Sequence, residues 1–162
     1  MELIGIPADM IGRILLAGFL GALAGIERDV SGRPSGLRTT MIIAISSCLV
    51  TILSIDVFMP MNVRVDVTRM TAGIVSGVGF LGAGVIMHNK TDVRGLTTAA
   101  DIWLVASVGI AVGAKMYALA TFVTLFVVIA LIGLAPVSYF FANIGRKRTE
   151  EWEKQNGNRN SL

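Results

Sequence analysis

Five long apolar segments, separated by short polar loops, occupy almost the whole of this 162-residue chain. Each approaches the roughly 20 residues that an α-helix needs to cross the hydrocarbon core of a bilayer. Only 15% of the residues are charged, against about 25% in a typical soluble domain. The pattern predicts an all-α polytopic membrane protein that lies in a lipid bilayer and leaves no room for a soluble catalytic domain.

The ends of the apolar segments give the expected spans. They cover about 11–26, 39–58, 70–87, 97–114 and 116–141, and together they form a five-helix transmembrane domain over residues 1–145. Residues 146–162 begin with Arg146-Lys147-Arg148 and continue without apolar periodicity. Because a basic cluster beside a last span attracts anionic headgroups, we expect a basic and then polar cytoplasmic tail.

The distribution of Lys and Arg among the loops predicts the orientation. With five spans, the loops after the first and third helices lie on the same side as the C-terminus, and this side holds ten of the 14 Lys and Arg residues. Cytoplasmic loops carry an excess of positive charge. We therefore expect the N-terminus outside and the C-terminus in the cytoplasm.

A shift of 59 residues aligns the first two helices with the third and fourth. The aligned pairs include Gly18 with Gly77, Gly25 with Gly84, and Gly36-Leu37 with Gly95-Leu96. Each unit would contain two spans, so the two units would run in the same direction. We predict two parallel helical-hairpin repeats plus a fifth helix, with both charged loops on one cytoplasmic surface.

Small residues recur at helical spacing on three of the segments. The expected helix-packing positions are Ala17, Gly21 and Gly25 on the first, Gly73, Gly77 and Gly82 on the third, and Gly109 and Gly113 on the fourth. Such stripes let helices approach closely inside a membrane. Packing within the chain and self-association of two chains would both produce them, and we expect a homodimer through a small-residue face.

The third segment contains five glycines within twelve residues, from Gly73 to Gly84. Two interpretations are open. Either this helix is crowded by neighbours on all sides, or its backbone is locally non-helical. Irregular backbone at membrane depth is tolerated only inside protein or beside water, so the second interpretation predicts a helix that lines a cavity.

Asp101 is the clearest ionisable residue within a span, about one turn inside the fourth helix. A carboxylate near a helix start is favoured by the helix dipole, whereas a deeper one is normally paired or faces a cavity. One interpretation is an interfacial residue at the helix start. The other pairs Asp101 with Arg38 or Arg94, or places it on a cation or proton route.

Arg38 lies at the start of the second helix, where a guanidinium needs a carboxylate, phosphate or carbonyl partner. Glu27, at the end of the first helix, is the natural candidate, and such a pair would be structural. Arg38 and Arg94 facing one site would instead suit an anion. The predicted cytoplasmic functional cluster comprises Glu27, Arg28, Arg38, Arg94, Thr98 and Asp101.

Motifs of enzymes and of nucleic-acid-binding proteins are absent from the sequence. It contains no nucleophile–base pairing, no phosphate-binding loop and no cluster of metal ligands, since the single histidine has no Cys or carboxylate neighbours. We therefore expect no catalytic residues, no cofactor and no nucleic-acid partner. Bound magnesium stays possible, with Asp101 and Glu27 as the candidate ligands.

Four motifs together resemble the MgtC/SapB family of bacterial membrane proteins. They are Gly25-Ile26-Glu27-Arg28, Ser35-Gly36-Leu37-Arg38-Thr39, the glycine-rich Ser76–Gly84, and Val93-Arg94-Gly95-Leu96-Thr97-Thr98-Ala99-Ala100. The resemblance runs from about residue 15 to residue 113. It implies a bacterial inner-membrane protein connected with growth in low magnesium and with virulence.

The resemblance also implies a function. It favours a non-enzymatic regulator that acts on other membrane proteins through its cytoplasmic face, a proton-translocating ATP synthase being one such partner. The alternative is a magnesium or proton transporter or channel that uses Asp101 and Glu27. Longer members add a cytoplasmic C-terminal domain, so we expect a short form here. Asp101 stands where the family has a small or hydroxylic residue, so no family role is carried onto it.

Overall fold

The structure, a computed structural model, describes residues 7–30, 32, 35–61, 66–89 and 92–134. Within these residues the chain is helical apart from one small antiparallel hairpin. The chain divides into Met1–Val128, which holds the packed helices, and Ile129–Leu162, of which the end of the last helix is described. The predicted all-α class is confirmed, and the predicted tail lies outside the described residues.

The helices follow the apolar segments, with different ends. They are α1 (Ala8–Val30), α2 (Leu37–Ile52) with the π-helical turn η1 (Leu53–Phe58), α3 (Val67–Val85), α4 (Leu96–Gly113) and a fifth helix, Tyr117–Leu134. Strand β1 (Met87–Asn89) pairs with β2 (Asp92–Arg94), where the sequence indicated only a loop. The first helix is longer than predicted because its polar first and last turns, which contain Asp9 and Arg28, are also helical.

Four of the described helices are long and apolar enough to cross a membrane: α1, α2 continued by η1, α4 and the fifth helix. Helix α3 has nineteen residues and is not among these four. The protein is therefore a membrane protein with four to five spanning helices. The full set of five predicted spans depends on α3.

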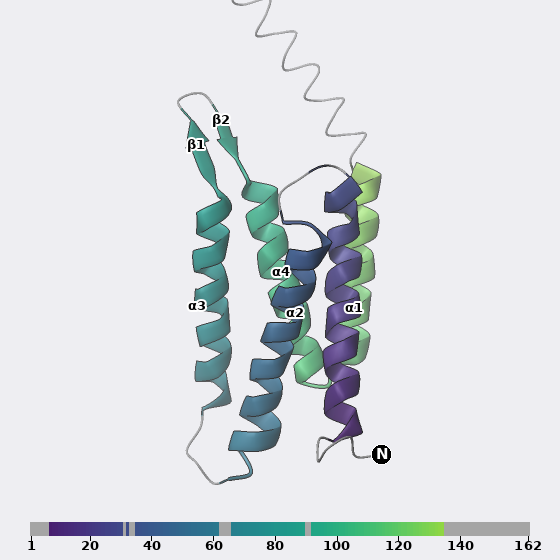
Figure 1. Ribbon diagram of the computed structural model, residues 1–162, viewed down its shortest axis with the longest axis vertical. Coiled ribbons are helices and arrows are strands. Elements are labelled where there is room, and N and C mark those ends of the chain that lie inside the picture. Colours follow the sequence, from purple (N-terminus) through teal and green to yellow (C-terminus); the bar gives the residue numbers. More distant parts are fainter. Residues whose placement is uncertain (1–6, 31, 33–34, 62–65, 90–91, 135–162) are drawn as a thin grey trace, which may run out of the picture. The chain divides into compact units, whose positions relative to one another are not determined.

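Helices α2 and α4 pack against each other, α1 packs against both, and α3 packs mainly against α4 (Figure 1). The β-hairpin lies at the same end as the last turn of α1 and the first turns of α2 and α4. We call this end the hairpin end and the opposite one, where α1 begins, the amino-terminal end.

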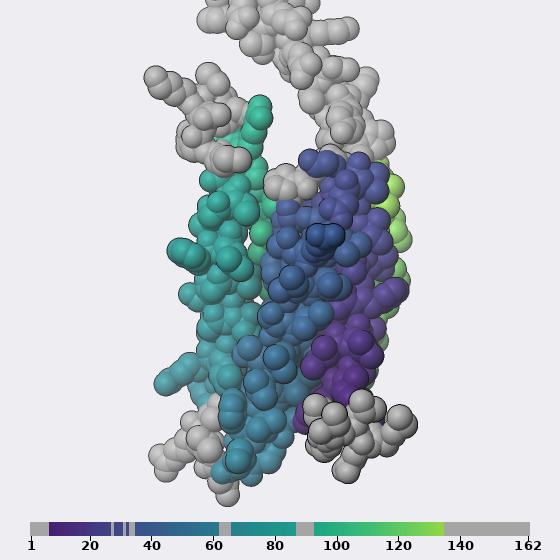
Figure 2. All heavy atoms as spheres, in the orientation of Figure 1, coloured from purple at the N-terminus to yellow at the C-terminus, as the bar shows by residue number. Residues whose placement is uncertain are grey.

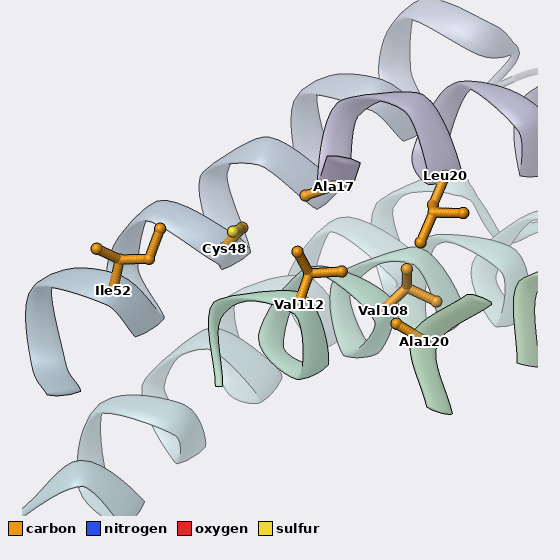
Figure 3. Close-up of a cluster of buried hydrophobic side chains, with 7 residues drawn as sticks. All are labelled: Ala17, Leu20, Cys48, Ile52, Val108, Val112 and Ala120. Atoms are coloured by element: carbon orange, nitrogen blue, oxygen red, sulfur yellow. The ribbon is translucent and has the colours of Figure 1, made fainter. Parts of the chain in front are cut away.

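One apolar cluster joins four helices near the amino-terminal half of α1 (Figure 3). Its members are Ala17 and Leu20 of α1, Cys48 and Ile52 of α2, Val108 and Val112 of α4, and Ala120 of the fifth helix. A second cluster, around Ala24, Val78 and Val105, extends the core to α3. Burial of these side chains fixes which face of each helix points inward.

Two of the three predicted small-residue stripes pack within the chain. A Cβ atom on Gly21 would lie 2.7 Å from the Ala44 Cβ atom, so α1 contacts α2 closely there. A Cβ atom on Gly113 would lie 2.9 Å from the carbonyl oxygen of Cys48, so α4 contacts α2 in the same way. The remaining stripe, on α3, differs, because a Cβ atom on Gly73 or Gly77 would meet nothing within 4 Å.

The backbone of α3 is not broken, so the prediction of a locally non-helical segment is wrong, and within this chain α3 is not crowded on all sides. It is α-helical from Val67 to Val85. Space is open beside Gly73, Gly77, Gly79 and Gly84, while Gly82 makes an ordinary contact with Ala99. Asp66 caps the helix by accepting hydrogen bonds from the Thr68 hydroxyl and amide, and these hydrogen bonds lower the pKa of the Asp66 carboxyl.

The helix starts agree with the 59-residue shift, whereas the aligned glycines do not share surroundings. Helices α1 and α3 begin at Ala8 and Val67, and α2 and α4 begin at Leu37 and Leu96. Yet a Cβ atom on Gly18 would lie 3.0 Å from Ile45, while its aligned partner on α3 faces open space. The parallel repeat therefore stays a prediction.

Candidate functional site

Arg28 and Asp101 form a buried ion pair at the hairpin end. The Arg28 Nε atom lies 2.8 Å from Asp101 Oδ2, with the side chains 0% and 3% exposed. Arg28 Nη1 donates a hydrogen bond to Thr98 Oγ1 at 2.9 Å, and Nη2 donates one to the carbonyl oxygen of Thr97 at 2.6 Å. The last turn of α1 is thereby joined to the first turns of α4.

The position of this pair follows from helical spacing. Arg28 lies three residues beyond Gly25, on the stripe by which α1 packs into the core. Asp101 lies eight residues, or about two turns, before Gly109 on the packing stripe of α4. Both charges are therefore carried inward by the same faces that bring the helices together, and each is compensated by the other.

Asp101 pairs with Arg28, a partner that was not among the candidates Arg38 and Arg94. Three members of the predicted cluster, Arg28, Thr98 and Asp101, do meet. Asp101 is buried inside the protein, because only 5% of the residue is exposed. The Glu27 side chain lies outside the described residues.

Arg38 and Arg94 are exposed at the same end. Arg38 and Thr39 line a cavity of about 430 Å³ together with Asp29 and Gly36. Asp29 Oδ2 accepts a hydrogen bond of 3.0 Å from the Leu37 amide, so a carboxylate already caps the start of α2. The predicted Glu27–Arg38 pair lies outside the described residues.

A second charged cluster, which was not predicted, lies at the amino-terminal end. Arg13 is 2% exposed and donates from Nη1 to the Gly113 carbonyl oxygen at 2.8 Å. Its Nη2 atom contacts Asp9 Oδ2 at 2.8 Å and Asp56 Oδ2 at 2.5 Å. The Lys115 Nζ atom is 3.5 Å from Asp56 Oδ1. The start of α1 is thus joined to the ends of η1 and α4.

Arg13 is buried inside the protein. Arg13 lies four residues before Ala17, on the packing stripe of α1, and this spacing was the signal that could have placed it inside. No spacing in the sequence predicted that Asp56 would contact Arg13. It reaches Arg13 from the π-helical turn η1, whose wider winding changes the direction of the side chain.

Three of the described carboxylates contact arginine side chains. Asp101 contacts Arg28, and Asp9 and Asp56 share Arg13. Among the described residues, no three His, Cys, Asp or Glu side chains are grouped as metal ligands. Of the two candidate magnesium ligands, Asp101 has one oxygen on Arg28, and the Glu27 side chain lies outside the described residues.

Fold and site together define a class, namely a helical membrane protein whose helices are joined by buried arginine–aspartate contacts at both ends. The model of the MgtC family matches residues 14–140. The chain belongs to the MgtC family.

Several relatives support this assignment. The chain is 42% identical to Protein SapB of Bacillus subtilis, over 90% of this chain and 64% of the relative. It is 41% identical to the Putative magnesium transporter YhiD of Escherichia coli K12, over 69% and 54%. It is 40% identical to Protein MgtC of Brucella abortus, over 67% and 44%. The chain thus spans between 44% and 64% of the length of these relatives. No solved structure matches it.

Proposed function

We propose that this chain is a non-enzymatic regulator in the bacterial inner membrane that acts on other membrane proteins during magnesium limitation. Its hairpin end would lie in the cytoplasm and carry the contact surface. The observation that carries the proposal is the exposure of Arg38 and Arg94 at the end where the buried Arg28–Asp101 pair joins α1 to α4. The link to magnesium is supported by the name of the relative from Escherichia coli.

Arg38 and Arg94 both lie on ordered elements, which fix the positions of their side chains in advance of binding. Arg38 lies in the first turn of α2, whose start is capped by Asp29, and Arg94 belongs to the short hairpin. A guanidinium group has five N–H donors in a fixed geometry, so an exposed arginine on an ordered element suits binding of a carboxylate or a phosphate. A proton-translocating ATP synthase is one membrane partner that the family resemblance supports, and virulence is the context that it implies.

Cation transport is the second candidate, and one observation favours it. Buried hydroxyl groups lie along α2 between the two charged ends, at Thr40, Ser47 and Thr51. Two observations weigh against a route there. The Thr51 hydroxyl donates back to the Ser47 carbonyl of its own helix at 2.8 Å, and α4 packs backbone against backbone on α2 where Gly109 meets Ala44.

Removal of the exposed charges tests the regulatory proposal. Arg38→Ala combined with Arg94→Ala is expected to abolish the contribution of the protein to growth in low magnesium, because the contact surface loses its donors. Growth of a deletion strain complemented with each variant measures the effect, at equal membrane levels of protein. Arg69→Ala, an exposed arginine of α3, is the matched control and should grow normally. Normal growth of the double variant would refute the site.

Reconstitution tests the transport candidate. Purified protein in liposomes is expected to produce no magnesium or proton flux above that of empty vesicles, because Asp9, Asp56 and Asp101 are held by arginines. Fluorescent indicators inside the vesicles report both fluxes. A flux that Asp101→Asn abolishes would establish transport and overturn the regulatory proposal.

A further inference from the structure

Two opposite charges line one cavity at the hairpin end without pairing with each other. Asp29 of α1 and Arg38 of α2 line the cavity of about 430 Å³, together with Gly36 and Thr39. We call it the charged cavity. Among the described residues, no ion pair joins Asp29 to Arg38 or either of them to a third side chain. Figure 2 shows the indigo end of α1 beside the blue start of α2 at the upper end. The two charges therefore leave space for a ligand between them.

The carboxylate of Asp29 has a fixed position in the charged cavity. Its Oδ2 atom accepts the hydrogen bond of 3.0 Å from the Leu37 amide, and a Cβ atom on Gly36 would overlap its Oδ1 atom. The absence of a side chain at Gly36 thus provides the space in which the carboxylate lies. Because an ionised carboxylate has about four lone-pair sites, Asp29 can still accept N–H donors from a ligand.

Arg38 and Thr39 supply the donors of the charged cavity. Both are exposed in the first turn of α2. A guanidinium group binds a phosphate through two parallel N–H donors, and a hydroxyl group can donate a further hydrogen bond. A phosphate on these two residues and an ammonium group on Asp29 would satisfy both charges at once. A simple anion would be repelled by Asp29, and a simple cation would be repelled by Arg38, so the cavity favours a zwitterionic ligand.

The side of α2 that continues from Arg38 into the membrane is apolar and exposed. Ile42 and Leu49 follow Arg38 by four and eleven residues, and therefore lie on the same side of the helix. They are 59% and 42% exposed. On α1, Val30 follows Asp29 directly and is 85% exposed. Charges at the end of a spanning helix, with an apolar side beneath them, match the order of headgroup and acyl chains in a phospholipid.

We propose that the charged cavity binds the headgroup of a phospholipid that carries a phosphate and a primary ammonium group, as phosphatidylethanolamine does. The phosphate contacts Arg38 and Thr39, the ammonium group contacts Asp29, and the acyl chains lie along the exposed side of α2. This lipid site does not rest on the proposed regulatory function. A transporter could hold the same lipid, and lipid binding is measured on the purified protein rather than through growth.

Thermal unfolding of the detergent-solubilised protein tests the lipid site. A ligand that binds only the native state raises Tm with its concentration, so titration with short-chain phosphatidylethanolamine gives an apparent Kd. Phosphatidylcholine, whose quaternary ammonium group has no N–H donor, and phosphatidylglycerol, which has no cation, should bind about tenfold more weakly. Free phosphoethanolamine, which has no acyl chains, should also bind more weakly. Equal affinity for the three lipids would overturn the headgroup assignment, and equal affinity for phosphoethanolamine would overturn a lipid as the occupant.

Two variants separate the roles of the two charges in the same titration. Arg38→Ala should weaken binding of phosphatidylethanolamine about tenfold, because the phosphate loses a charged donor. Asp29→Asn should keep the cap of α2, since the asparagine oxygen can accept from the Leu37 amide, but its preference for phosphatidylethanolamine over phosphatidylglycerol should disappear. Arg69→Ala, at an exposed arginine of α3, is the control and should bind as wild type does. A preference that survives Asp29→Asn, or equal losses in Arg38→Ala and Arg69→Ala, would refute this site.

Discussion

Arg28→Met is expected to lower the free energy of unfolding by about 3–5 kcal/mol, the typical cost of removing one partner from a buried ion pair. The substitution keeps most of the side-chain volume but leaves the Asp101 carboxylate, 3% exposed, without its guanidinium. Thr98 Oγ1 and the Thr97 carbonyl oxygen lose their donors as well. Denaturation of the purified protein in mixed detergent micelles, followed by circular dichroism, measures the loss.

A double-mutant cycle separates the ion pair from general damage to packing. Asp101→Leu alone should also be destabilising, because it leaves the Arg28 charge buried. Arg28→Met combined with Asp101→Leu should recover much of the loss, since two apolar side chains need no compensation. Arg38→Met, at an exposed arginine of the same end, is the control and should change stability little. Additive losses in the double variant would contradict a coupled pair.

More of this site could have been predicted from the helical spacing of the sequence. Arg13, Ala17, Gly21, Gly25 and Arg28 fall on one side of an α-helix. The small residues among them were interpreted as a packing face, whereas the arginines at its two ends were not counted as part of it. Because a buried arginine needs a partner from another helix, the stripe itself predicted an ion pair at each end. Only the identity of the partners required the structure.

Other features had no signal in the sequence. The π-helical turn η1 brings Asp56 to Arg13, and such a turn follows from tertiary packing rather than from residue preference. The hairpin β1–β2 is only three residues per strand, too short for alternation to indicate it. The apolar runs, in contrast, predicted the helices well, because membrane insertion depends on length and hydrophobicity.

The glycines of the three stripes look alike in the sequence, although their surroundings differ completely. Gly25, Gly109 and Gly113 are each pressed against another backbone or a short side chain, whereas Gly73 and Gly77 face open space. Periodicity identifies a smooth face but not what covers it. In the structure, α1 and α4 pack their smooth faces against α2, whereas the smooth face of α3 is exposed.

Gly109→Ala is accordingly expected to destabilise the monomer by about 1–3 kcal/mol or more, the range for overpacking a tight core. The added methyl group would overlap the Ala44 carbonyl oxygen and lie 2.9 Å from the Ser47 Cβ atom. Since the obstacle is backbone, α2 and α4 must separate to admit it, and contacts along both helices weaken together.

Gly77→Ala is the matched control, being the same substitution on a helix where the methyl group meets nothing. It should be neutral or stabilising by up to about 1 kcal/mol, because alanine favours the helix more than glycine does. Unfolding of the detergent-solubilised protein measures both variants. Equal losses would mean that α3 is packed as tightly as α4. A loss confined to Gly109→Ala would show that the glycine stripe of α4 is packed within the chain and that of α3 is not.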